Sequence, residues 1–197
     1  MGEMIKMVVV LTFLSSLSGG LLAYVKDTTR EQINNQVLQF VKGPAVRGIF
    51  HDAENDPITD RFSISRGKTS LDFFVARLNG KATTVAFETF GKGFGGNLGL
   101  MVAVDVKNDK IYGLGVTTHS ETAGVGARAK DDPSFAAQFK GMPLLKPINI
   151  TPDGGQVNAL SGATITSRAV CATATQAGQL YKELKPQIQE KLKAFTQ

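Results

Sequence analysis

The hydrophobic pattern of this chain begins with one long uncharged stretch. Residues 7–25 read MVVVLTFLSSLSGGLLAYV and contain no charged side chain. A helix needs about 20 mainly apolar residues to cross the core of a bilayer, so this stretch predicts a membrane-spanning helix. The competing interpretation is a cleaved signal peptide. It is the weaker of the two, because a signal peptide has an apolar region of only about 7–15 residues and a small-x-small cleavage site, which is missing here.

The charges around this stretch do not fix its orientation in a membrane. Lys6 and the terminal amine precede it, whereas Lys26 and Arg30 follow it. The positive-inside rule therefore hardly separates the two orientations.

A second helix is predicted directly after the uncharged stretch. Apolar side chains recur at helical spacing through residues 28–40, and Gly43 and Pro44 then predict a break. We therefore expect three parts: a transmembrane anchor over residues 1–26, a juxtamembrane helix over residues 27–42 and a globular domain over residues 43–197.

The remaining chain has first a strand-like and then a helical pattern. Apolar and β-branched runs predict strands at residues 71–78, 83–90, 98–106 and 111–118. The turn-forming residues 107–110 favour a hairpin between the last two strands. The later segments predict a helix at 133–140, a short strand at 148–150, and two helices at 167–184 and 186–195, separated near Pro186. Strands followed by helices predict an α+β domain with a mainly antiparallel sheet and flanking helices.

Composition narrows the function classes. The 197-residue chain has a formal net charge of +5, but its basic residues are scattered, which argues against nucleic-acid binding. Cys171 is the single cysteine, so the chain alone forms no disulfide and no cysteine-based metal site. His51 and His119 are the only histidines, and no nucleophile–base triad is evident. We therefore predict no catalytic residue and no metal in this chain.

The segment 158–167 carries the clearest chemical signal. It reads NALSGATITS and places small and hydroxyl residues directly before a predicted helix. Gly162 and Ala163 leave room for a bulky group, while Thr166 or Ser167 is expected to cap the helix. The positive end of a helix is a natural phosphate site. An ordinary turn and cap have the same composition, and spacing alone favours that simpler interpretation.

A resemblance to a known family changes this balance. Residues 160–167 resemble the flavinylation motif of the FMN-binding domain family, in which the threonine after Ser-Gly-Ala is joined to FMN through a phosphoester bond. The corresponding residue here is Thr164. Residues 119–126, HSETAGVG, resemble the family's Glu-Thr-Pro-Gly-Leu-Gly segment near the flavin, and the Gly-Phe-Gly-Gly run at residues 93–96 also matches.

The resemblance implies a cofactor site around these motifs. Backbone N–H groups near residues 165–167 would hold the phosphate, while Glu121 and Thr122 would lie near the isoalloxazine ring. An exposed surface carboxylate is the equally weighted alternative for Glu121, and for His119 and Arg128 structural and surface roles are favoured. The implied cofactor-binding residues are Ser161, Gly162, Ala163, Thr164 with covalent FMN, Ile165, Thr166, Ser167, Glu121 and Thr122.

Within the family, the short length and His119 before the Glu-Thr pair are most similar to the G subunits of Rnf ion-translocating electron-transport complexes. The resemblance implies a bacterial inner-membrane, single-pass protein with an extracytoplasmic flavin domain. Its partners would be membrane, iron–sulfur and flavin subunits of the same complex, and a flavin transferase that uses FAD as donor. The chain would relay electrons inside this redox-driven ion translocase, with no substrate turnover of its own.

Other interpretations remain open at this stage. The alternatives are the C subunit of sodium-translocating NADH:quinone oxidoreductase, a membrane-tethered FMN-binding sensor, and a structural subunit with a vestigial flavin site. Asn158 supports the last of these, because the family usually has an acidic residue at this position. Ala123 and Val125 replace the family's Pro and Leu, changes that affect loop stiffness more than chemistry.

Overall fold

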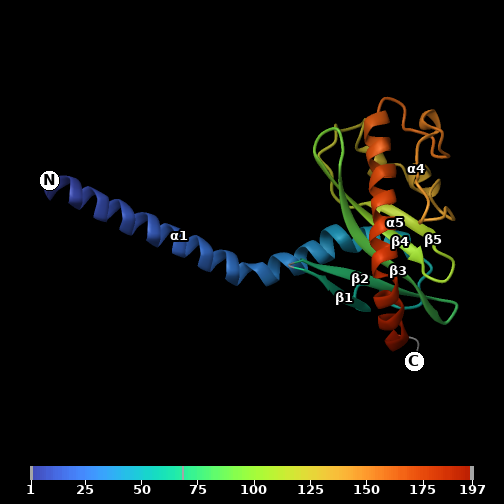
Figure 1. Ribbon diagram of the computed structural model, residues 1–197, viewed down its shortest axis with the longest axis horizontal. Helices are drawn as coiled ribbons and strands as arrows, with labels where there is room; N and C mark the ends of the chain where they lie inside the picture. The colour runs from blue at the N-terminus through green and yellow to red at the C-terminus, as the bar shows by residue number, and fades with distance from the viewer. Residues whose placement is uncertain (1, 68, 196–197) are drawn as a thin grey trace. The chain divides into compact units, whose positions relative to one another are not determined.

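The computed structural model describes residues 2–67 and 69–195 (Figure 1). These residues belong to two compact units, which divide between Phe40 and Val41. The first unit is helical, and the second contains the described strands.

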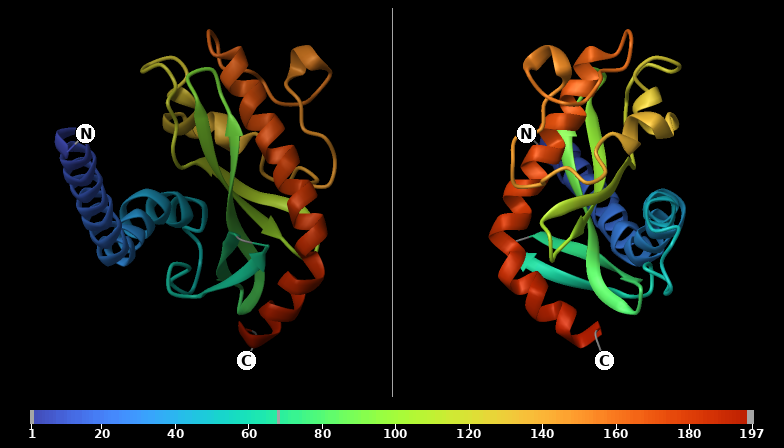
Figure 2. Two further views of the ribbon diagram at one scale, coloured as in Figure 1. Left: turned by 60° about the vertical axis from the view of Figure 1, so that its left-hand side comes forward. Right: turned by 90° about the vertical axis from the view of Figure 1, so that its right-hand side faces the viewer.

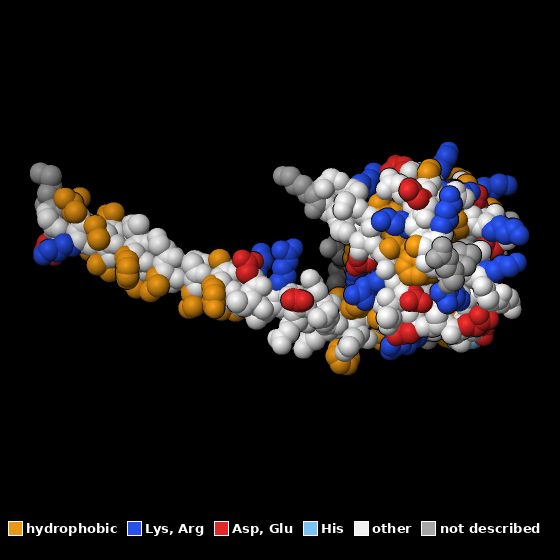
Figure 3. All heavy atoms as spheres, turned by 90° about the horizontal axis from the view of Figure 1, so that it is seen from below, with side chains coloured by type: hydrophobic (Ala, Val, Ile, Leu, Met, Phe, Trp, Pro, Cys, Tyr) orange, Lys and Arg blue, Asp and Glu red, His pale blue; other side chains and the backbone are white. Residues whose placement is uncertain are grey.

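The first unit is dominated by helix α1, Gly2–Gln36. Its apolar side chains are exposed rather than packed, and Leu22 for example is 72% exposed. Figure 3 shows hydrophobic side chains along this helix between charged groups near its two ends. The helix is long and apolar enough to cross a membrane, as the uncharged stretch predicts.

The expected break at Gly43 and Pro44 is wrong. Helical conformation continues from α1 through a π-helix, Val37–Lys42, into α2, Gly43–Ile49. Pro44 lies at the start of α2, directly after the π-helix, and does not end the helical segment.

The second unit is built on a five-stranded antiparallel sheet in the order β1-β2-β3-β4-β5, counted over the described residues. The strands are β1 Arg61–Arg66, β2 Thr69–Leu78, β3 Lys81–Lys92, β4 Asn97–Asp105 and β5 Lys110–Val116. Every predicted strand from residue 71 to residue 118 is present within a few residues of its expected ends. The predicted α+β class with an antiparallel sheet is therefore confirmed.

Strand β1 was not predicted, although its sequence RFSISR alternates apolar and polar side chains. Ile64 is buried and Phe62 stacks on Phe73 with ring centroids 5.3 Å apart. The signal was the period-two pattern itself, which is typical of a half-buried strand.

Helix α5, Thr164–Leu192, covers one face of the sheet (Figure 2). Its buried face includes Val170, Ala174 and Tyr181, which belong to the same core cluster as Phe87 and Leu100 of the sheet. This packing places the first turn of α5 next to the loops that follow the central strands.

The prediction of two helices separated near Pro186 is wrong, because α5 runs through this residue. Pro186 is exposed, so water can hydrate the carbonyl that loses its hydrogen bond. Leu184, Ile188 and Leu192 are buried on both sides of the proline and hold the helix against the domain.

Short helices complete the domain. These are α3 Arg128–Asp131, α4 Pro133–Ala137, η2 Thr151–Asp153 and η3 Lys193–Phe195. Asp132 caps α4 by accepting a hydrogen bond from the Ser134 N–H at 3.0 Å, and the helix ends before the predicted residue 140. The strand predicted at 148–150 is wrong: Ile150 forms only a single bridge to Val157, because the segment is too short to build a ladder.

Candidate functional site

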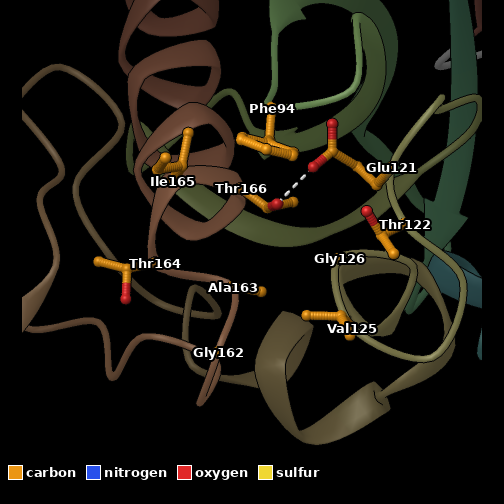
Figure 4. Close-up of a pocket in the computed structure, with 10 residues that line it drawn as sticks. All are labelled: Phe94, Glu121, Thr122, Val125, Gly126, Gly162, Ala163, Thr164, Ile165 and Thr166. Carbon is orange, nitrogen blue, oxygen red and sulfur yellow. Dashed lines mark hydrogen bonds between the residues drawn. The ribbon is translucent and has the colours of Figure 1, made fainter.

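Three segments that are distant in sequence enclose a cavity of about 360 Å³ (Figure 4). They are the turn between β3 and β4, the loop after β5, and the first turn of α5 with the loop before it. The cavity is in the size range of small-ligand sites, about 300–1,000 Å³. Its lining residues are Phe94, Glu121, Thr122, Val125, Gly126, Gly162, Ala163, Thr164, Ile165 and Thr166.

The first turn of α5 forms one wall of the cavity. The helix begins at Thr164, and its N-cap is Ala163, which supplies no side-chain hydrogen bond. The N–H groups in the first turn of a helix have no carbonyl partner within the helix, so they remain available to an anion. The positive left-handed φ of +78° at Gly162 makes the turn that leads into this wall.

The expected capping role of Thr166 or Ser167 is wrong, because α5 begins before both residues. Ser167 is buried, and its hydroxyl donates to the Ala163 carbonyl at 2.9 Å and accepts from the Leu160 N–H at 3.0 Å. It therefore fastens the loop before α5 to the helix and does not line the cavity.

The other predicted positions either line the cavity or lie outside it. Thr164 is half-buried at the cavity, and Figure 4 shows its hydroxyl pointing away from the Glu121–Thr166 pair. Ser161 is exposed and lies outside the lining. The structure thus brings together all the predicted positions except Ser161 and Ser167, across a sequence separation of more than 40 residues.

Glu121 is buried in the cavity wall, with 8% of its surface exposed, so the alternative of a surface carboxylate is wrong. Its Oε1 accepts the Gly95 N–H at 2.9 Å, and its Oε2 accepts the Thr166 hydroxyl. Burial opposes ionisation, but the Thr166 hydroxyl and the N–H groups of Gly95 and Phe94 outweigh it and lower the pKa of Glu121. The carboxylate is therefore ionised at neutral pH and held by both oxygens.

Two glycines make room for this carboxylate. A Cβ added to Gly93 would lie 2.2 Å from Glu121 Oε1, and one on Gly126 would lie 2.9 Å from Glu121 Oε2. Gly93 of the Gly-Phe-Gly-Gly run and Gly126 of the 119–126 segment therefore share one role, which is to let the backbone approach a buried charge closely.

Sequence reasoning predicted Ile165 but missed two other apolar residues of the lining, Phe94 and Val125. Phe94 is 68% exposed, Ile165 53% and Val125 40%, although all three are large hydrophobic residues. Their gathering at one cavity indicates an apolar ligand surface or a partner. Phe94 stands among glycines in the sequence, and an aromatic residue in such a turn was the available signal.

The neighbouring polar residues have protein partners. His119 Nδ1 accepts the Glu121 N–H at 3.3 Å, and Arg128 pairs with Asp132 at 3.5 Å. The Asn158 N–H donates to Gln138 at 2.7 Å, and its side-chain oxygen accepts from the Thr151 hydroxyl at 3.1 Å. His119, Arg128 and Asn158 do not line the cavity. Within residues 2–67 and 69–195, no cluster of His, Cys, Asp and Glu is suited to a metal ion.

Comparison with known proteins places this geometry in a family. The model of the FMN-binding domain matches residues 93–179, a segment that contains the whole cavity lining. The G subunit of the ion-translocating oxidoreductase complex of Cereibacter sphaeroides is 34% identical over 170 residues, which cover 81% of this chain and 75% of that protein. The chain belongs to the G-subunit family of ion-translocating oxidoreductase complexes.

Other G subunits and a related structure agree. The G subunit of the proton-translocating ferredoxin:NAD(+) oxidoreductase complex of Clostridium ljungdahlii is 31% identical, and the match covers 81% of this chain and 82% of that protein. The solved C subunit of the Na(+)-translocating NADH-quinone reductase from Parabacteroides distasonis has a TM-score of 0.52 and 28% identity. The match covers 59% of this chain and 63% of that chain, which is less than two thirds of it. The family resemblance stated from the motifs is confirmed, and the G subunits are its better-supported branch.

Proposed function

We propose that this G-subunit homologue carries one FMN esterified through its phosphate to Thr164 and relays electrons within a membrane-bound, ion-translocating oxidoreductase. The observation that carries the proposal is the position of Thr164. It is the first residue of α5, it lines the cavity, and the N-cap before it supplies no side chain to the open N–H groups. A phosphate attached to this hydroxyl would meet the positive end of the helix.

The residues present fit such a cofactor. Phe94, Val125 and Ile165 offer apolar surface to an aromatic ring, and Thr122 offers a hydroxyl to its polar edge. FMN supplies one- and two-electron chemistry when it is bound, and the protein positions it and tunes its potential. The Thr166 hydroxyl donates a hydrogen bond to Glu121, and this bond connects α5 to the loop after β5 in the cavity wall.

Thr166 is the nearest competing threonine in the motif, but its environment disfavours attachment. Its side chain is buried, with 2% of its surface exposed, and its hydroxyl already donates to Glu121. Ser161 is exposed but precedes the turn at Gly162 and lies outside the lining. Thr164 alone combines a half-buried hydroxyl with the start of the helix.

The proposal extends to the location of the protein in the cell and to its partners. We infer a single-pass anchor through α1 in the bacterial inner membrane, with the second unit on the extracytoplasmic side. A flavin transferase would attach the cofactor there, and the electron donor and acceptor would be membrane, iron–sulfur or flavin subunits of one complex. The family membership and the apolar α1 support a membrane-anchored protein.

Intact-protein mass spectrometry with peptide mapping tests the attachment. Chain purified from its native membrane should show a mass gain of one FMN less one water, located on Thr164. Thr164→Val should remove the gain completely, while Thr166→Val should keep it. An unmodified Thr164 in a host with an active transferase would overturn the covalent assignment and point to Asn158 as the defect.

A further inference from the structure

We propose that the Glu121 carboxylate is a fixed negative charge that lowers the reduction potential of the flavin in this cavity. The inference rests on the proposed function and deepens it, since it gives Glu121 an electrostatic role toward the flavin.

The first step is that the hydrogen-bond donors around the Glu121 carboxylate are uncharged. They include the Gly95 N–H and the Thr166 hydroxyl. The ion pairs found among the described residues do not include Glu121. The nearby His119 ring accepts the Glu121 backbone N–H through Nδ1 at 3.3 Å.

The second step is that this charge acts at the cavity. Glu121 lines the same cavity as Thr164, and its wall includes the apolar side chains of Phe94, Val125 and Ile165. A charge in such surroundings is weakly screened, so it acts over several ångströms. Adding an electron next to a fixed negative charge is unfavourable, and the reduction potential therefore falls.

A second buried carboxylate provides a matched control. The Glu88 side chain is 8% exposed, but it pairs with Lys42 at 3.1 Å and does not line the cavity. Replacing Glu88 removes a buried negative charge elsewhere in the same domain. Any general consequence of losing such a charge should therefore appear in Glu88→Gln as well.

The test is the flavin potential of the full-length chain in detergent, measured by spectroelectrochemistry after mass spectrometry has confirmed the flavin on Thr164. Glu121→Gln should favour one-electron reduction by roughly tenfold, which corresponds to about 59 mV. Gln is isosteric and keeps an oxygen for the Gly95 N–H. Glu88→Gln should change the equilibrium by less than roughly threefold, because its charge is paired with Lys42 and lies outside the lining.

Two further variants keep the inference testable if Glu121→Gln does not fold. Glu121→Asp and Thr166→Val retain the charge but disturb its hydrogen bonds, so both should stay within roughly threefold of the native equilibrium. A tenfold shift in either, or no shift in a folded Glu121→Gln, would overturn the electrostatic role. An unmodified native Thr164 would instead overturn the proposed function, and the mass would reveal this before any potential is measured.

Discussion

Glu88 and Glu121 are both buried carboxylates of the second unit, but the groups that hold them differ in charge. Glu88 of β3 pairs with the Lys42 ammonium and also accepts the Thr117 hydroxyl. The donors to Glu121 are neutral groups, among them the Gly95 N–H and the Thr166 hydroxyl. The first region is a neutral pair, whereas the second leaves a net negative charge at a cavity. Burial alone therefore does not tell whether a carboxylate stabilises the fold through an ion pair or leaves a negative charge at a binding site.

The Glu88 region connects segments rather than enclosing a ligand space. Lys42 is the last residue of the π-helix, and Thr117 directly follows β5. Lys130 of α3 donates to the Thr117 carbonyl at 3.0 Å. Glu88 thus ties the start of the second unit to the strand end that leads into the 119–126 loop.

The largest loss of stability is expected from Lys42→Met, which keeps the aliphatic length and removes the positive charge that pairs with Glu88. It leaves Glu88 buried without its cation, and we expect the free energy of unfolding to fall by about 3 kcal/mol. For a chain of this size the melting temperature should fall by about 6–12 °C. Thermal unfolding of the full chain in detergent, followed by circular dichroism, measures this shift.

Arg66→Met is the control for Lys42→Met. Arg66 and Glu183 pair at 2.8 Å, which is closer than Lys42 and Glu88, but both side chains are more than half exposed. Exposed pairs contribute at most about 1 kcal/mol, so this variant should be nearly neutral. Equal shifts for the two variants would show that Glu88 is not held by its cation.

A smaller effect is expected from Gly93→Ala, which crowds the Glu121 region. The new methyl group would lie 2.2 Å from Glu121 Oε1, and the carboxylate must move away from the Gly95 N–H. We expect a loss of about 2 kcal/mol in the free energy of unfolding. Gly48→Ala is the control, because its Cβ meets nothing within 4 Å.

A double-mutant cycle decides whether the clash is with Glu121 itself. Combined with Glu121→Ala, Gly93→Ala should lose most of its effect, because the oxygen it meets is gone. Urea unfolding of the four chains measures the coupling. Additive effects would mean that the Gly93 backbone is constrained by something other than this carboxylate.

The smallest effect is expected from Thr166→Val, which removes one neutral donor from Glu121. We expect a loss of about 1 kcal/mol at neutral pH and a higher pKa for Glu121. Its folded pKa is lowered, so its contribution to stability is present above the unfolded pKa and is lost as pH falls through the folded pKa. The difference between native chain and variant should therefore shrink on acidification, as measured by urea unfolding between neutral and acidic pH.

Thr173→Val is the matched control for this pH dependence. Thr173 is also buried in α5, but its hydroxyl donates to the Ala169 carbonyl at 2.7 Å and not to a carboxylate. Its effect should be the same at every pH. A pH-dependent Thr173→Val, or a pH-independent Thr166→Val, would contradict the assignment of Glu121 as the titrating group.

Local patterns predicted much of the fold because the interactions involved are local. The uncharged residues 7–25 lie in the exposed apolar helix α1, and the alternating runs between residues 71 and 118 are strands. Pro186 was misleading, because burial of Leu184 and Ile188 on either side of it outweighs the lost hydrogen bond. Helix propensity is a weak preference that such tertiary packing overrides.

The sequence by itself determined the apolar N-terminal helix, the antiparallel α+β class and the motif that places Thr164 near the start of a helix. Only the tertiary structure decided the state of Glu121. Its partners Gly95 and Thr166 lie 26 and 45 residues away along the chain, so no local pattern reveals that they meet. A carboxylate is exposed or buried, and charged or neutral, according to the donors and the dielectric around it, and folding brings these together from separate segments.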